Sequence, residues 1–238
     1  MLYLIGLGLN EDGISKYGLE TAKKCKKIYV ENYTVDFPYS LNSLKDLIGK
    51  KIVEADREMV EGLGIVDEAA KMDVALLIYG SPLTATTHIS LIQEAKASGV
   101  RYKIIFNASI LDAVAETGLQ LYKFGKIASM PAWKKSYEPD SFIEIVKDNK
   151  QISAHSLILI DIGLDFHEAL EQLKKSAKKH EIKLKKLLVC QSLGTKYRKI
   201  VYRGIEELKE FRGVKKPYCI IIPGKLHFVE KEVLESFN

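Results

Sequence analysis

Short apolar runs alternate with amphipathic stretches through the first half of the chain. Residues 2–7 and 74–79 are apolar almost throughout, which is typical of strands buried on both faces of a parallel sheet. After the second run, Ile89, Ile92 and Ala95 recur at the spacing of one helical face. The pattern predicts repeated strand–helix units with right-handed crossovers and a mostly parallel sheet.

Two further strands and their helices fit the same organisation. Residues 28–30 and 104–106 are short apolar runs that we interpret as strands. Ser15 is the expected N-cap of the helix before the first of them, because its hydroxyl can accept from an otherwise unbonded backbone N–H. Asn107 or Ser109 is expected to cap the helix that follows the second.

The periodicity fails between residues 125 and 140, where Pro131 and Pro139 interrupt the chain. We therefore predict two domains, residues 1–125 and 126–238.

The second domain has a different pattern, with more strands than helices. Asp165 is the expected N-cap of its first amphipathic helix, and residues 205–211 form a second helix. Because few helices separate the strands, we expect a mixed sheet. The predicted strands cover residues 157–162, 187–190, 199–202 and 218–222.

Composition narrows the class of protein. The chain has 238 residues, 47% of them hydrophobic, and a net charge of +5 that could favour an acidic partner but is too small to indicate nucleic-acid binding. Cys25, Cys190 and Cys219 lie far apart in apolar contexts, so we expect buried free thiols and a reducing, cytoplasmic location. We find no export signal and no apolar run near the roughly 20 residues that cross a membrane.

The first strand ends in Gly6-Leu7-Gly8, which permits two interpretations. Glycines at this place let a nucleotide-like cofactor approach the backbone, but they also form ordinary tight turns. A third glycine at the expected offset is missing, and Glu11 and Asp12 would repel a pyrophosphate. Both interpretations stay open, whereas a P-loop is excluded because no Gly-Lys-Ser/Thr follows a strand.

Two loops rich in small and hydroxyl residues follow neighbouring strands. Residues 79–88 and 107–110 lie where α/β folds bind ligands, at the carboxyl ends of strands. The alternative for the first loop is a simple turn in which Thr86 or Thr87 caps the next helix. His88 has no carboxylate partner in the sequence, so we expect it to pack or cap rather than to act as a base. The histidines and cysteines show no metal-ligand spacing, and we expect no metal site.

Three segments together make the chain similar to one known family, the archaeal-type diphthine synthases. They are Gly6-Leu7-Gly8-Leu9, the run from Gly80-Ser81-Pro82 to His88, and Pro223-Gly224-Lys225-Leu226-His227. Shorter matches fall between them in family order, including Tyr122-Lys123-Phe124-Gly125. The resemblance runs nearly from end to end.

This resemblance implies a two-domain α/β fold of the tetrapyrrole-methylase type, in a homodimer, with S-adenosylmethionine in the cleft between the domains. It also implies methylation of a 3-amino-3-carboxypropyl-histidine on translation elongation factor 2. No membrane or nucleic-acid partner is expected. Matching the family motifs to this chain gives eight cofactor-binding residues: Leu9, Ser81, Thr84, Ser109, Ile110, Ile160, Leu193 and Tyr218.

Some positions depart from the family pattern. Ser81 replaces the usual Asp, and a hydroxyl makes a weaker hydrogen bond to the cofactor than a carboxylate does. Asn107 and Gln191-Ser192-Leu193 also differ from the usual residues. Two alternatives stay open: a methyltransferase for a corrin or porphyrin precursor on the same fold, or a cofactor-binding module without turnover, for which Ser81 is the only motive. The sequence names no general base, so the catalytic residues stay unassigned.

Overall fold

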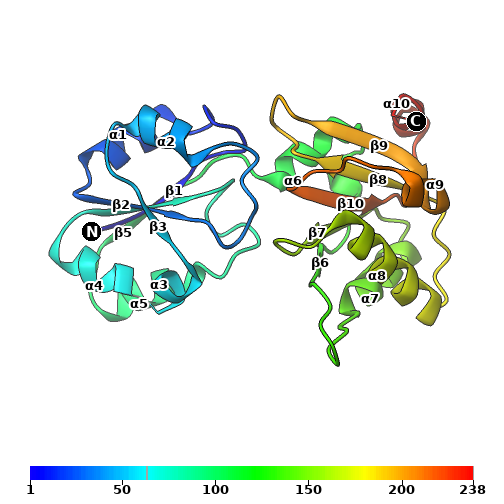
Figure 1. The fold of residues 1–238 in the computed structure, drawn as a ribbon, viewed down its shortest axis with the longest axis horizontal. Helices are drawn as coiled ribbons and strands as arrows, with labels where there is room; N and C mark the ends of the chain where they lie inside the picture. Colours follow the sequence, from blue (N-terminus) through cyan, green and yellow to red (C-terminus); the bar gives the residue numbers. More distant parts are fainter. Residues whose placement is uncertain (63, 238) are drawn as a thin grey trace. The chain divides into compact units, whose positions relative to one another are not determined.

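The computed structural model describes residues 1–62 and 64–237, which form two compact units, Met1–Leu111 and Asp112–Asn238. The first unit contains a five-stranded sheet in which all strand pairs are parallel (Figure 1). This confirms the parallel sheet predicted from the apolar runs. In sheet order, the strands are β3 (Val53–Ala55), β2 (Lys27–Glu31), β4 (Val74–Ile78), β1 (Leu2–Gly6) and β5 (Tyr102–Ile105).

Helices cover both faces of this sheet (Figure 1). Ile5 and Leu77 point to the face that packs against α1 (Lys16–Lys24) and α2 (Leu41–Ile48). Leu4 and Leu76 point to the opposite face, because side chains alternate along a strand. The helices on that face are α3 (Arg57–Glu61), α4 (Gly64–Lys71) and α5 (Ile89–Ala97).

The second unit contains a mixed sheet, as the sequence predicts. β6 and β7 are parallel, and the other three strand pairs are antiparallel. In sheet order, the strands are β6 (Ala128–Met130), β7 (Ser156–Ile160), β10 (Tyr218–Ile222), β8 (Lys186–Gln191) and β9 (Lys199–Gly204).

One core of the second unit lies between this sheet and three helices, to which Phe142, Leu170 and Leu208 contribute buried side chains. α10 buries Leu234 as well. The helical segments are α6 (Ile110–Ala113), η1 (Val114–Thr117), η2 (Leu121–Lys123), α7 (Ser141–Gln151), α8 (Phe166–Lys179), α9 (Ile205–Glu210) and α10 (Phe228–Glu235).

Two predicted helix caps are confirmed, and one alternative that the sequence left open is excluded. Ser15 accepts from the backbone N–H of Gly18 at 3.0 Å, and Asp165 accepts from that of His167 at 2.8 Å, so both cap helices as expected. Neither threonine before α5 caps it. His88 occupies the N-cap position without a side-chain hydrogen bond, because its ring is buried instead.

None of the helices in the described part of the chain has the length and apolar character needed to span a bilayer.

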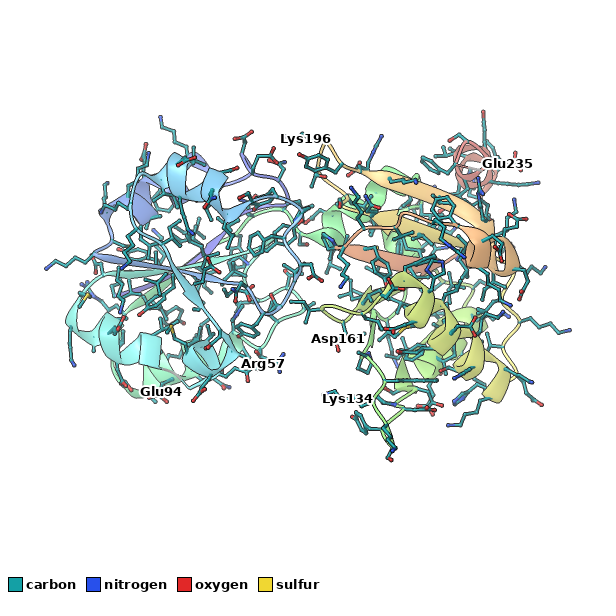
Figure 2. All side chains as sticks on the ribbon, viewed as in Figure 1. Arg57, Glu94, Lys134, Asp161, Lys196 and Glu235 are labelled. Atoms are coloured by element: carbon teal, nitrogen blue, oxygen red, sulfur yellow. The ribbon has the colours of Figure 1, made fainter. Side chains whose placement is uncertain are left out.

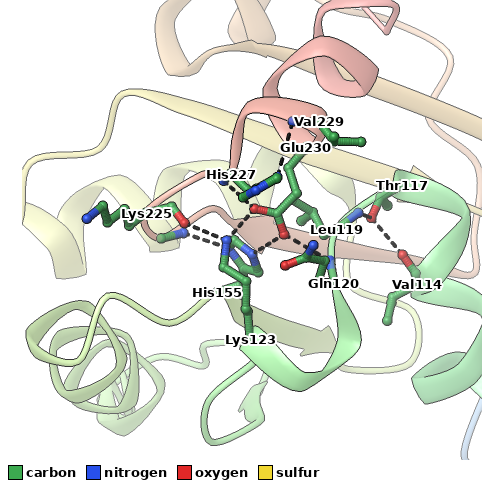
Figure 3. Close-up of polar contacts among 11 residues, drawn as sticks. Val114, Thr117, Leu119, Gln120, Lys123, His155, Lys225, His227, Val229 and Glu230 are labelled. Atoms are coloured by element: carbon green, nitrogen blue, oxygen red, sulfur yellow. Dashed lines mark hydrogen bonds and ion pairs between the residues drawn. The ribbon is translucent and has the colours of Figure 1, made fainter.

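The division between the units falls at Leu111, ahead of the boundary at residue 125 that we predicted from the sequence. A buried hydrogen-bond network centred on Glu230 of α10 holds Gln120 and Lys123 in the second unit (Figure 3). Its Oε1 accepts from the backbone N–H of Gln120 at 2.9 Å and from His155 Nε2 at 3.1 Å. Its Oε2 accepts from the backbone N–H of His227 at 2.7 Å and pairs with Lys123 Nζ.

The network is fully satisfied despite its burial. His155 is completely buried, and its Nδ1 accepts from the backbone N–H of Gly224 at 2.9 Å, which leaves Nε2 as the donor to Glu230. Burial alone raises the pKa of Glu230, but donors including Gln120 and Lys123 outweigh it and lower the pKa to about 2. Three segments distant in sequence are therefore held together by one ionised carboxylate.

We predict that Glu230→Gln lowers the free energy of unfolding by about 3 kcal/mol at pH 7, because it leaves buried donors and Lys123 without an anion. Because folding lowers the pKa of Glu230, its stabilisation is present above the unfolded pKa of about 4.3 and is lost as pH falls towards 2. Urea unfolding should thus show the two proteins converging over this pH window.

The control is Glu235→Gln on the same helix, whose carboxylate lies 3.9 Å from Lys231 on the surface. We expect it to change the free energy of unfolding by less than about 1 kcal/mol. If both variants lose the same free energy of unfolding, the buried network of Glu230 stabilises the protein no more than a surface ion pair does.

Candidate functional site

Three loops of the first unit meet at the carboxyl edge of its sheet, after β1, β4 and β5. Gly8 and Gly80 exchange two backbone hydrogen bonds of 3.0 and 2.9 Å, which join the first two loops. Tyr79 adds a third link, since its hydroxyl donates to the carbonyl of Leu9 at 2.9 Å. This is the edge at which parallel α/β sheets bind ligands.

Asn107 braces the same edge from the third loop. Its Nδ2 donates to the carbonyl oxygens of Gly6 at 3.0 Å and Gly13 at 2.8 Å. Its side chain is therefore not the helix cap. Ser109 takes that role, because its Oγ accepts from the backbone N–H of Leu111 at 3.2 Å. The structure thus decides between the two caps that the sequence left open.

Gly6 lies where the loops cross and has no room for a side chain. A Cβ at this position would lie 2.7 Å from the Gly80 carbonyl oxygen, 2.8 Å from Pro82 Cδ and 2.9 Å from Asn107 Cβ. Gly8, with φ at +71°, makes the turn that follows. The first glycine of Gly6-Leu7-Gly8 thus permits close packing of the loops, and the second permits the backbone conformation.

Five of the eight predicted site residues lie in these loops. Leu9, Ser81 and Ser109 are buried, whereas Thr84 and Ile110 are half-buried. The Ser81 hydroxyl is 3.4 Å from the backbone nitrogen of Asn107, and its carbonyl accepts from the Thr84 N–H at 3.2 Å. The structure therefore brings the first-unit residues of the predicted site to one edge.

The other three predicted residues lie in the second unit, also near one another. Ile160 ends β7 and Tyr218 begins β10, and these strands are neighbours in the sheet. Leu193 follows β8 and is buried, and the adjacent Ser192 N–H donates to the carbonyl of Pro217 at 2.9 Å. The Tyr218 hydroxyl is 3.2 Å from the Leu164 carbonyl, so this side chain also serves the core of the unit.

Glu116 is a residue of this region that the sequence did not single out. Its Oε1 accepts from the backbone N–H of Gly194 at 2.7 Å, and its Oε2 pairs with Arg198 at 2.8 Å. Glu116 thereby fixes the loop that carries Leu193. No motif in the sequence pairs these positions, because 78 residues separate Glu116 from Gly194.

The described residues contain no group of three or more histidine, cysteine or acidic side chains that could hold a metal ion. Cys25, Cys190 and Cys219 are buried free thiols, as expected.

Two α/β units, the first with three loops at the sheet edge where α/β folds bind ligands, are the architecture expected of the tetrapyrrole-methylase class. The model of the tetrapyrrole (corrin/porphyrin) methylases matches residues 1–209, and the chain belongs to this family of methyltransferases. Within it, the chain is 38% identical to the diphthine synthase of Methanocaldococcus jannaschii, over 99% of this chain and 98% of that protein.

Two further similarities agree. The chain is 43% identical to the diphthine methyl ester synthase of Homo sapiens, over 76% of this chain and 64% of the human protein. A crystal structure of diphthine synthase superposes with a TM-score of 0.90 at 30% identity, covering 99% of this chain and 95% of that one. The resemblance to diphthine synthases, the fold class and the methyltransferase activity expected from the sequence are therefore confirmed.

We predict that Gly6→Ala weakens binding of S-adenosylmethionine, the cofactor that the resemblance implies, by at least about tenfold. The added methyl group must displace backbone or proline atoms, which pushes the three loops apart, and overpacking of this kind costs about 1–3 kcal/mol. Titration calorimetry measures the affinity. Gly64→Ala is the matched control, because a Cβ there meets nothing within 4 Å.

If Gly6→Ala binds the cofactor as tightly as the Gly64 variant does, the loops after β1, β4 and β5 are not the cofactor site.

Proposed function

We propose that this protein uses S-adenosylmethionine to methylate the 3-amino-3-carboxypropyl-histidine of translation elongation factor 2, which forms diphthine. The observation that carries the proposal is the near-complete match to a diphthine synthase, which covers 98% of that protein and so includes both units. A match confined to the first unit would support only a shared cofactor site.

Eight residues are proposed to bind the cofactor. What supports the first-unit residues is the convergence of three loops, braced by Asn107, at the edge where α/β sheets bind ligands. What supports the second-unit residues is their common position at neighbouring strand ends. The proposed residues are Leu9, Ser81, Thr84, Ser109, Ile110, Ile160, Leu193 and Tyr218.

Methyl transfer from a sulfonium needs little chemistry from the protein, because the leaving group is a neutral thioether. The main requirement is to hold the acceptor nitrogen in line with the methyl carbon and to exclude water. What supports this role for the first-unit loops is their close packing around Gly6 and the hydrogen bonds that join Gly8 to Gly80 and Asn107 to Gly6. Remote contacts of a protein substrate supply the free energy that aligns the amine.

We expect elongation factor 2 that carries the 3-amino-3-carboxypropyl group to gain whole methyl groups when incubated with the protein and S-adenosylmethionine. Mass spectrometry of the intact factor counts them. The unmodified factor and free histidine should gain none, because they lack the acceptor amine or the remote contacts. An unchanged mass of the modified factor, with cofactor binding proven by calorimetry, would favour a corrin-type substrate or a module without turnover.

We also propose a homodimer in the cytoplasm. The family resemblance supports the dimer, and exposed side chains such as Tyr122 and Phe228, which are 81% and 74% exposed, are of the kind that interfaces bury. The free buried thiols support the reducing compartment. Light scattering should give twice the 26.8 kDa of one chain. A single-chain mass at micromolar concentration contradicts the dimer.

A further inference from the structure

Four polar side chains of the first unit, two of them buried and two half-buried, have buried hydrogen-bonding atoms without a partner. We call Glu31, Tyr33, Thr86 and His88 the Glu31 cluster. Glu31 is fully buried, and its Oε2 has no hydrogen-bond partner. The same is true of Thr86 Oγ1 and of both ring nitrogens of His88, which is 1% exposed. The methyl-transfer site described above uses none of these residues.

The members of the cluster come from two neighbouring strand ends. Glu31 is the last residue of β2, and Thr86 and His88 follow β4, which is the next strand in the sheet. The Tyr33 ring meets the His88 ring edge-on, with centroids 6.4 Å apart. Arg57, labelled in Figure 2, lies over the Tyr33 ring at 5.3 Å. The cluster therefore lies at the same carboxyl edge of the sheet as the three loops.

A polar atom that is buried without a hydrogen-bond partner destabilises the folded state, so each such atom requires an explanation. A buried polar atom left without a hydrogen bond costs about 1–3 kcal/mol, and native proteins keep few of them. Five such atoms occur here within two short segments, since the Tyr33 hydroxyl oxygen also has no partner. The Thr34 hydroxyl donates to Glu31 Oε1 at 2.5 Å, which leaves Oε2 unused.

A comparison of Glu31 with Glu230, the other buried glutamate among the described residues, shows which partner Glu31 lacks. Glu230 receives several donors and a lysine, and its pKa is about 2. Burial raises the pKa of Glu31 to about 7, because the hydrogen bonds from Thr34 and Tyr33 do not offset the loss of water. The structure describes no ion pair of Glu31 with a basic side chain. A cationic donor is the ligand that would complete this carboxylate.

The other members add neutral polar contacts. Burial lowers the pKa of His88 to about 4, against the effect of the Glu61 carboxylate, so the ring is neutral near pH 7 and has one N–H donor and one acceptor. Burial and the Glu31 carboxylate raise the pKa of Tyr33 to about 12, so it stays a phenol. A ligand with both an ammonium and an acceptor group fits such surroundings better than a hydrocarbon does.

We propose that the Glu31 cluster binds the ammonium of an α-amino-acid head group on the acceptor substrate and that Glu31 accepts its proton before methyl transfer. This inference rests on the proposed function, in which the acceptor carries a 3-amino-3-carboxypropyl group. The ammonium N–H bond breaks and its proton moves to Glu31 Oε2. The nitrogen lone pair then bonds to the methyl carbon, and the carbon–sulfur bond breaks with its electrons going to sulfur.

The cofactor also carries an α-amino-acid head group, so its ammonium is a second candidate for the group that the Glu31 cluster binds. The two sources differ in what Glu31→Gln affects. If the acceptor occupies the cluster, the variant loses turnover and keeps its affinity for S-adenosylmethionine. If the methionyl end of the cofactor occupies it, the affinity itself falls.

We expect Glu31→Gln to lower kcat with the modified elongation factor at least about 100-fold, the usual range for loss of a general base. The dissociation constant for S-adenosylmethionine, from calorimetry without acceptor, should stay within about twofold of the native value. The melting temperature should stay unchanged or rise, because a buried carboxylate without a cation is replaced by an amide of the same shape.

Thr86→Val is the second variant, and it tests the cluster even if Glu31→Gln does not fold. Because the Thr86 hydroxyl has no internal partner, an isosteric methyl group should not destabilise the protein. We expect a KM for the modified factor about five times higher or more. A purely structural role of Thr86 predicts no change.

Glu68→Gln is the matched control. Glu68 pairs with Lys27 at 2.5 Å and Tyr29 at 2.7 Å, and Lys27 begins β2 at the opposite edge of the sheet from Glu31. This variant should melt at a lower temperature with an unchanged kcat.

The outcomes separate the proposals. Native kcat in Glu31→Gln, or native KM in Thr86→Val, overturns the Glu31 cluster and leaves the proposed function intact. A cofactor affinity that falls tenfold in Glu31→Gln overturns the proton-acceptor role in favour of the cofactor head group. A native protein that does not methylate the modified factor overturns the proposed function, and this inference falls with it.

Discussion

A buried carboxylate must be given donors by the fold, and the Glu230 network shows how much structure follows from that requirement. Glu230 accepts from Gln120 and His227 backbone, His155 and Lys123, which come from three stretches of the second unit. Losing one donor would leave this buried carboxylate only partly compensated. The network therefore holds Gln120 and Lys123 against α10 within the second unit.

The network also explains part of the family resemblance. Two of the motifs that carry it, Tyr122-Lys123-Phe124-Gly125 and Pro223-Gly224-Lys225-Leu226-His227, supply Lys123, Gly224 and His227 to the network. Their role here is structural. The motifs of the first unit have a different role. Gly6-Leu7-Gly8 and the loop from Gly80 to His88 form the sheet edge at which the cofactor and acceptor are proposed to bind.

Much of the fold could be predicted from the sequence, and the exceptions have physical causes. Strong apolar runs such as β1 and β4 were found because a strand buried on both faces needs an apolar residue at nearly every position. β3 and β6 were missed because three residues are too few to show a period. The alternative that Thr86 or Thr87 caps α5 is excluded only by the structure, because local sequence does not reveal that the buried His88 occupies the N-cap position.

The sequence by itself determined the fold class, the methyltransferase family and the strand-end loops, since all three depend on local pattern and on motifs contiguous along the chain. Only the tertiary structure decided that Asn107 braces Gly6 and Gly13, that Glu116 holds Gly194, and that Glu230 is satisfied whereas Glu31 is not. These facts concern the hydrogen-bond partners of buried groups. Such partners lie tens of residues away, and no local period or motif encodes which of them will meet.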